Sequence, residues 1–169
     1  MKNMASLSPD KKVSAVCGLF CPSCSLYIGT AEDAKRLEIV ARKFSRPVSD
    51  MKCEGCRSAN VSFYCKTCLF KNCAEDRGIE FCGECAEYPC EKLAEFRKQA
   101  PHRAQLWESQ EILKKEGFEK WFENRKSYHS CSSCNTLNSV YDPVCRNCGK
   151  SPSSPFFEEN RKIIEPFIS

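Results

Sequence analysis

The sequence lacks the short motifs that mark the common catalytic classes. It has no glycine-rich phosphate-binding loop, no G-x-S-x-G nucleophile turn and no H-E-x-x-H metalloprotease helix. Histidine occurs only twice, and the acidic residues are scattered in positions typical of solvated helix faces. These absences leave an enzymatic function open without favouring it, and we assign no catalytic residue.

A membrane-spanning pattern and a secretory leader are also missing. The uncharged run 13–30 reaches the length of a membrane span, but it contains Pro22, two glycines and several serines and cysteines, which match hydrocarbon poorly. The amino-terminal region has no long leucine-rich core of the kind that secretory leaders use. We expect a protein of the reducing cytoplasm that does not bind membranes.

Hydrophobic residues are too few for a large core. Their fraction of 41% includes fifteen cysteines, and about 32% remains when these are set aside. A structural zinc contributes on the order of 10–16 kcal/mol to folding, whereas a whole domain is stable by only about 5–15 kcal/mol. Bound metal can therefore replace part of the missing core.

Cysteine is the abundant residue, with 15 in 169 positions. Twelve form six C-x-x-C pairs, in which two thiolates on a tight turn present half of a tetrahedral metal site. The pairs are Cys21/Cys24, Cys53/Cys56, Cys65/Cys68, Cys82/Cys85, Cys131/Cys134 and Cys145/Cys148. Disulfides are the alternative, but an odd number of cysteines would leave one thiol unpaired.

The basic composition gives no argument for nucleic acid. The formal net charge is +4, but twelve thiolates on three divalent ions would change it to about −2. Net charge therefore indicates no basic patch.

The most regular cysteine pattern is that of a zinc ribbon. Cys131-x2-Cys134 and Cys145-x2-Cys148 are ten residues apart. Asn135 and Gly149 follow the second cysteine of each pair, where the backbone often needs a positive φ. Four thiolates close the zinc shell, which predicts a structural ion without an open position for substrate.

Two further groups of four are expected to bind metal. Cys53, Cys56, Cys65 and Cys68 have similar regular spacing, and zinc is the expected occupant, although a rubredoxin-like iron fits the same ligands. Cys73, Cys82, Cys85 and Cys90 are spaced less regularly, and both zinc and a four-iron cluster remain open. Neighbouring groups can also interleave their ligands.

Cys17-x3-Cys21-x2-Cys24 leaves three thiolates without a fourth partner. Radical S-adenosylmethionine enzymes hold a cluster with such spacing, but they need a strand–helix barrel for which this chain has no room. A cluster or zinc completed by a distant ligand is the preferred interpretation, and reactive or buried thiols are the alternative.

The chain as a whole is expected to be a small α+β or irregular metal-stapled protein. We divide it into a disordered segment 1–12, a cysteine-rich domain 13–127, a zinc ribbon 128–150 and a tail 151–169. Helical patterns lie at about 31–44 and 91–127, the second broken at Pro101 and Gly117, with Thr30 as the N-cap of the first. Knuckles, short strands and turns are expected between Cys53 and Cys90.

The chain resembles a family of small cysteine-rich prokaryotic proteins known only as a domain of unknown function. The resemblance covers about residues 13–125, and some similar proteins add a carboxy-terminal zinc ribbon. It implies metal binding and a prokaryotic cytosolic origin, but no reaction. The motifs that carry it are C-G-L-x-C-x-x-C-x-x-Y at Cys17–Tyr27, C-x-G-C-R-S at Cys53–Ser58, Y-C-x-x-C at Tyr64–Cys68, C-A at Cys73–Ala74 and G-x-x-x-C-x-E-C-x-x-Y-P-C at Gly78–Cys90.

These patterns together predict a metal-binding protein, mainly of zinc, that acts as an interaction or adaptor module for other proteins. The alternative is an iron–sulfur redox or electron-transfer protein that uses Cys17, Cys21 and Cys24. A third interpretation is nucleic-acid binding through the ribbon.

Overall fold

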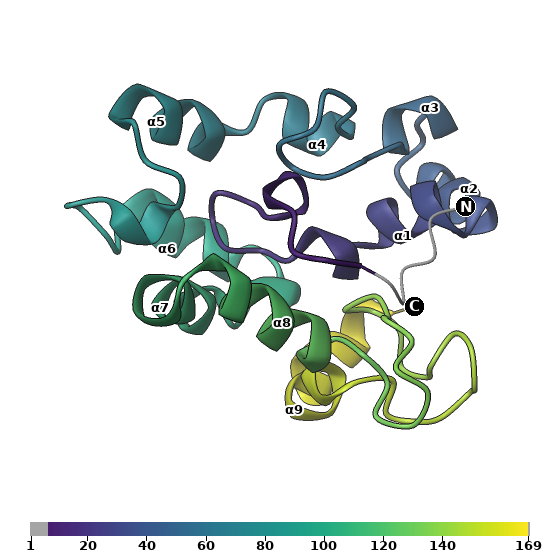
Figure 1. Cartoon of the computed structure of the whole chain (residues 1–169). Helices are drawn as coiled ribbons and strands as arrows, with labels where there is room; N and C mark the ends of the chain where they lie inside the picture. Colours follow the sequence, from purple (N-terminus) through teal and green to yellow (C-terminus); the bar gives the residue numbers. More distant parts are fainter. Residues whose placement is uncertain (1–6, 169) are drawn as a thin grey trace.

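Short helices and connecting loops make up the computed structural model, which describes residues 7–168 (Figure 1). The α-helices in this range are α1 (Ser25–Ala31), α2 (Ala34–Lys43), α3 (Val48–Met51), α4 (Phe63–Lys66), α5 (Leu69–Arg77), α6 (Glu91–Lys98), α7 (Leu106–Glu116), α8 (Phe118–Tyr128) and α9 (Pro155–Ile164). Single 3-10 turns lie at Lys11–Val13, Cys21–Ser23, Cys82–Glu84, Pro101–Arg103 and Glu165–Phe167.

The α+β prediction is not confirmed, because residues 7–168 are mostly helical. Strand pairing in that range is limited to two isolated antiparallel bridges, Ser14 with Phe20 and Ser130 with Leu137. The interval Cys53–Cys90 contains α4 and α5 instead of the expected short strands. Nine residues of α5 fit between Cys68 and Gly78, which ends the helix with φ +64°.

The first helical pattern, predicted at about 31–44, corresponds to α2, and α1 lies before it. Asp33 is the N-cap of α2, since its carboxylate accepts the Arg36 N–H at 3.2 Å. Thr30, expected in that role, lies in α1, and its hydroxyl donates to Leu26 O at 2.7 Å. Gly29 lets α1 and α2 approach closely, because a Cβ there would lie 2.8 Å from the side chain of Leu37.

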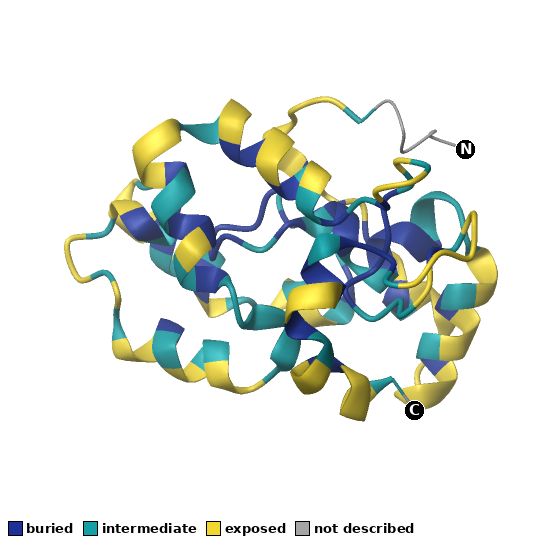
Figure 2. Cartoon of the chain, turned by 90° about the horizontal axis from the view of Figure 1, so that it is seen from below, coloured by how far each residue is buried: buried dark blue, intermediate teal, exposed yellow. Residues whose placement is uncertain are grey.

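A buried loop, residues 13–20, runs through the centre of the molecule, where Figure 2 shows buried coil inside helices whose outer faces are exposed. A buried loop needs partners for its backbone groups. Ala15 N–H donates to Leu19 O at 3.0 Å, and Cys82 N–H donates to Val16 O at 2.9 Å. The loop is therefore fixed to the cysteine turn at Cys82.

An aromatic core supports one side of this loop. Phe20 packs edge-on against Trp121 and Phe122 of α8, with ring centroids 5.9 and 5.3 Å apart. Leu137, which belongs to the ribbon segment, is buried in the same cluster. The helices α6, α7 and α8 are separated near Pro101 and Gly117, where the sequence carries its helix-breaking residues.

The ribbon segment packs on the carboxy-terminal residues and on the first helices. Residues Phe156, Phe157 and Ile164 of α9 bury their side chains against Val140. The Ser-Pro-rich stretch before α9, which resembles a linker in sequence, is a helix start: Ser154 accepts from Phe157 N–H, and Pro155 occupies the first turn.

The amino-terminal residues that the structure describes are anchored. Lys11 pairs with Glu80 at 2.7 Å, and Lys126 donates to Leu7 O at 2.7 Å. This differs from the disorder expected for 1–12, of which residues 1–6 lie outside the described range. Within residues 7–168, no helix combines the length and apolar character needed to cross a bilayer.

Candidate metal centres

The four ribbon cysteines lie close enough together to hold one metal ion. The Sγ atoms of Cys131, Cys134, Cys145 and Cys148 are all within 4.8 Å of one another. Cys131 and Cys148 have an Sγ–Sγ distance of 3.7 Å, and Cys134 and Cys145 one of 3.6 Å. A tetrahedral zinc with bonds of about 2.3 Å places its sulfur ligands about 3.8 Å apart. The group therefore fits the spacing of a single tetrahedral ion.

Two equivalent backbone turns create this spacing. Asn135 N–H donates to Cys131 O at 2.8 Å, and Gly149 N–H donates to Cys145 O at 2.9 Å. Asn135 has φ +56° and Gly149 φ +73°, which confirms the positive φ expected after each pair. Asn and Gly adopt that conformation at the lowest cost, so the sequence directly favours both turns.

The pKa of the Cys134 thiol is lowered, which favours cation binding at neutral pH. Hydrogen bonds from Thr136 lower the pKa of Cys134 to about 6, because they stabilise the thiolate. The Cys134 Sγ lies 3.3 Å from Thr136 Oγ1. Since the thiolate is the form that binds metal, the lowered pKa of Cys134 favours metal binding at this group.

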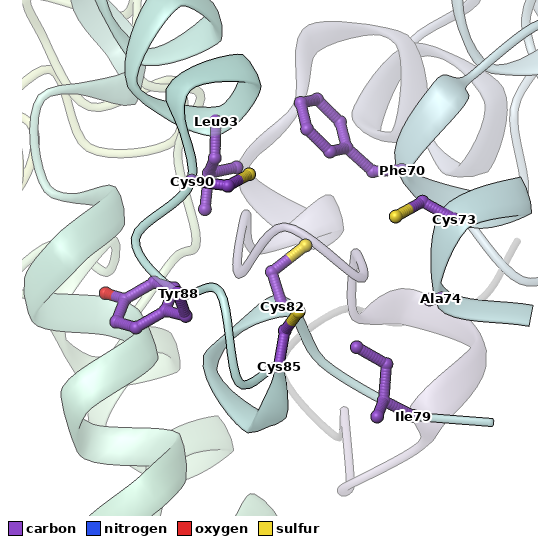
Figure 3. Close-up of a pocket in the computed structure, with 9 residues that line it drawn as sticks. All are labelled: Phe70, Cys73, Ala74, Ile79, Cys82, Cys85, Tyr88, Cys90 and Leu93. Atoms are coloured by element: carbon purple, nitrogen blue, oxygen red, sulfur yellow. The ribbon is translucent and has the colours of Figure 1, made fainter. Parts of the chain in front are cut away.

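A second group of four cysteines surrounds a cavity of about 30 Å³ (Figure 3). Cys73 lies on α5, and Cys90 is the N-cap of α6. Cys82 is the first residue of a 3-10 turn, and Cys85 is its C-cap. The apolar side chains of the wall are Phe70, Ala74, Ile79, Tyr88 and Leu93. The structure thus brings this predicted set together around a common space.

The electrostatics of this cavity reflect four neighbouring sulfurs. Burial, followed by the charges of Cys90, Cys73 and Cys85, raises the pKa of Cys82 to about 12. Glu87 N–H and the Arg77 guanidinium each donate to Cys85 Sγ at 3.4 Å. These donors would stabilise a negative sulfur once it binds a cation.

In the predicted set Cys53, Cys56, Cys65 and Cys68, the cysteines make contacts in pairs. Cys53 is hydrogen-bonded to Cys65, which lowers the pKa of Cys53 to about 6. Cys56 instead packs in a cluster with Cys17 and Cys68. Among the cysteines of residues 7–168, the ribbon alone has three or more sulfurs within 4.8 Å of one another.

Cys17, Cys21 and Cys24 lie along the buried loop and at the start of α1. Burial raises the pKa of all three thiols. Cys21 Sγ accepts the Cys56 N–H at 3.4 Å, which places the first cysteine group beside the Cys53–Cys56 turn. The two sequence groups are therefore interleaved in space, although no described trio of them shares a single-ion geometry.

Comparison with known families identifies the segment that carries most of these cysteines. Residues 13–95 match the family described as Protein of unknown function (DUF3795). The match confirms the resemblance seen in the cysteine motifs, and it includes Cys17 through Cys90. The ribbon and the helices α7 to α9 lie outside the matched segment. No curated protein and no solved structure matches the chain.

Helix α7 is hydrogen-bonded through one side chain to two cysteine-bearing loops of the matched segment. The Gln110 side chain is fully buried; its Oε1 accepts Gly83 N–H at 2.8 Å, and its Nε2 donates to Val16 O at 3.1 Å. Gln110 therefore positions the residues next to Cys17 and Cys82. Sequence analysis missed this role, because a glutamine within a helix gives no sign of what it will contact.

The histidines are packing residues in this structure. His129 lies between the rings of Phe20 and Phe156, with centroids 5.8 and 4.8 Å away. His102 Nδ1 is 2.6 Å from Tyr141 Oη, where the tyrosine can donate to a neutral imidazole. Burial, and then the charge of Arg103, lowers the pKa of His102 to about 4.

This low pKa predicts that acid destabilises the protein through His102. The unfolded chain binds a proton near the ordinary histidine pKa of about 6.5, whereas the folded protein resists it down to about 4. The folded state should lose about 2 kcal/mol between about pH 7 and about pH 5 from this group. Urea unfolding of His102→Asn, which keeps an acceptor for Tyr141, should show a shallower pH dependence. Equal dependence in both proteins would contradict the prediction.

Proposed function

We propose that this chain is a zinc-binding protein of the reducing cytoplasm that serves as an interaction or adaptor module. The observation that carries the metal assignment is the ribbon group, whose sulfurs have the separations of a tetrahedral site. Four thiolate ligands favour zinc or iron over the harder cations, and zinc is the usual occupant of such paired turns. The free state of all fifteen cysteines supports a reducing compartment.

The proposed zinc has a structural role. Four protein thiolates leave no coordination position for a substrate. The ribbon instead connects distant parts of the chain: Asp142 pairs with Arg36 of α2 at 2.9 Å, and Arg146 pairs with Glu32 at 2.6 Å. A metal that fixes the ribbon therefore also supports α2 and α9.

Cobalt substitution tests this assignment. Because cobalt(II) prefers the same ligands, the metal-free protein should bind one cobalt at the ribbon and develop the strong visible absorption of a tetrahedral thiolate complex. Zinc should displace it, since zinc binds thiolate sites more tightly than cobalt does. A weak octahedral spectrum, or cobalt uptake that survives Cys131→Ser unchanged, would contradict a ribbon site.

The proposed interaction surface is an exposed aromatic patch, defined here as Phe44, Phe63 and Tyr64. Phe44 is 43% exposed and Tyr64 is 52% exposed, and their ring centroids lie 5.4 Å apart. The Phe63 ring is tilted by 34° against Tyr64 with a centroid distance of 4.1 Å, and the Arg46 guanidinium lies 4.1 Å from the centroid of Phe63. Contiguous exposed aromatics beside an arginine are typical of protein interaction sites.

Quantitative affinity capture tests the adaptor role. The double substitution Phe44→Ser and Tyr64→Ser should abolish recovery of a partner that the unmodified chain captures, since aromatic anchors dominate protein interfaces. The matched control is Phe167→Ser, which removes another exposed aromatic residue (55%) outside the patch. Equal recovery by all three proteins would contradict an adaptor function of the patch.

A further inference from the structure

The cavity surrounded by Cys73, Cys82, Cys85 and Cys90 is not explained by a ribbon zinc. It lies within the family-matched segment, and none of its residues belongs to the ribbon. We propose that these four cysteines hold a four-iron, four-sulfur cluster, one cysteine on each iron. This site is separate from the proposed zinc centre, so either assignment can fail without the other.

The spacing of the four sulfurs argues against one zinc ion. Two sulfurs bound to the same zinc can be no more than about 4.6 Å apart, which is twice the bond length. Among the described residues, no three of these cysteines have Sγ atoms within 4.8 Å of one another. In a cubane cluster each cysteine binds a different iron, so the sulfurs are separated by the width of the inorganic core. Sulfurs that do not converge on one point can each bind a different iron.

The lining of the cavity suits an inorganic sulfur cluster. Its walls are carbon and sulfur surfaces, because apolar side chains fill the gaps between the cysteines. Figure 3 shows the sulfur atoms of Cys73, Cys82 and Cys90 directed toward the space that these elements enclose. Apolar cavities do not hold stable water, and well-packed interiors have few voids of this size. A sulfur-rich inorganic group would satisfy both the thiols and the apolar walls.

The surroundings also suit the charge of such a cluster. Binding releases four thiol protons to solvent, and the oxidised 2+ core with four thiolates then carries a net charge of −2. Arg77 donates to Cys85 Sγ at 3.4 Å and also hydrogen-bonds Cys73, while Glu87 N–H donates to Cys85 Sγ at 3.4 Å. Hydrogen bonds to ligand sulfurs stabilise clusters and raise their reduction potentials.

Anaerobic reconstitution of the full chain tests the proposal. The probe is an equal mixture of ferrous and ferric iron with sulfide, which balances the 2+ core without another oxidant. The wild type should bind four iron and four sulfide, turn brown and give a paramagnetic signal when dithionite adds one electron. Cys90→Ser and Cys73→Ser should lose the iron and sulfide.

The control is Cys134→Ser, which removes a ribbon ligand and should lose zinc while keeping the iron. Circular dichroism shows whether a variant has lost only its metal ligand or has also unfolded. The iron and sulfide content of the wild type tests the proposal even if a variant does not fold. Wild-type protein that binds zinc alone, with a zinc ion lost in Cys90→Ser, would overturn the cluster. Iron that survives both Cys73→Ser and Cys90→Ser would overturn this location.

Arg77 gives an independent readout of the location. Arg77→Leu should move the reduction midpoint of the cluster to a more negative potential, because it removes a positive charge and a hydrogen bond to Cys85. Arg42→Leu removes an exposed arginine from the end of α2 and should leave the midpoint unchanged. A midpoint that is equal in both variants would place the cluster elsewhere and overturn the assignment.

Discussion

Replacing Cys145 with serine is expected to remove the ribbon zinc and to unfold the ribbon together with α9. Cys145 is only 2% exposed, so no water-rich surroundings can take over the missing ligand. A structural zinc contributes on the order of 10–16 kcal/mol to folding, which is as large as the total stability of a typical domain, about 5–15 kcal/mol. The free energy lost with the zinc should therefore exceed the stability that the remaining contacts give the ribbon.

The measurement is zinc content together with helix content. Cys145→Ser should contain one zinc fewer per chain than the wild type and should lose the helical signal of α9, which packs on Val140 of the ribbon. Ser133→Ala is the matched control, because it changes an exposed residue in the other cysteine turn of the ribbon without removing a ligand. A Cys145→Ser protein with wild-type zinc would show that the ribbon is not the site.

The extent of unfolding decides whether the ribbon is an independent module. Leu137 is buried in one cluster with Phe20 and Trp121, and Val140 N–H donates to Ser23 O at 3.1 Å. These contacts predict that loss of zinc also exposes Trp121 and shifts its fluorescence to longer wavelength. Unchanged tryptophan emission after zinc loss would support separate folding of residues 13–127 and 128–150.

The gathering of Cys131, Cys134, Cys145 and Cys148 into one group was predictable because its determinants are local. Each half needs two cysteines three residues apart and a following residue that tolerates positive φ. Asn135 and Gly149 satisfy this requirement, and the structure gives both a positive φ. Short-range chemistry of this kind does not depend on how the rest of the chain folds.

Contacts between different cysteine groups could not be predicted from spacing. The regular pattern of Cys53, Cys56, Cys65 and Cys68 predicts one site, and Cys53 is hydrogen-bonded to Cys65 within it, but spacing gave no sign that Cys56 N–H donates to Cys21 Sγ of another group. These contacts depend on where the central loop lies. Its path is fixed by partners such as Gln110, which is distant in sequence.

Helix starts were predicted wrongly where the residue that caps the helix was not recognised in the sequence. The helix predicted at about 31–44 begins at Ala34, because Asp33 is its N-cap in place of Thr30 and accepts the Arg36 N–H. The tail was expected to begin with a linker, although Ser154-Pro155 is equally a good helix start. In both places the side-chain hydrogen bond decided the structure, and composition gave no measure of it.

Gly55→Ala is expected to be the most damaging change that removes no cysteine. Gly55 has φ +117°, a conformation that residues with a side chain rarely adopt. An added Cβ would lie 2.3 Å from Lys12 O and 3.2 Å from Val13 Cα. Both are backbone atoms, so the amino-terminal segment must move instead of a flexible side chain.

This movement should cost about 3 kcal/mol or more, since backbone strain and overpacking each contribute about 1–3 kcal/mol. Arg57 N–H donates to Lys12 O at 3.2 Å, and that bond would be lost as the segments separate. The shift would also displace Cys56 from Cys21 Sγ, so metal bound by this part of the chain should dissociate more readily.

Gly117→Ala is the control that separates the steric clash of an added Cβ from the backbone strain of a positive φ. Gly117 also has a positive φ, +86°, but an added Cβ would meet no atom within 4 Å. Denaturant unfolding at equal metal loading should therefore show a small loss for Gly117→Ala and a loss at least twice as large for Gly55→Ala. Equal losses would mean that the Lys12–Gly55 approach contributes nothing, because conformational strain alone would account for both. A larger loss at Gly55 would establish that the amino-terminal segment and the Cys53–Cys56 turn form one tightly packed unit, in which the position of the two cysteines depends on residues outside the turn.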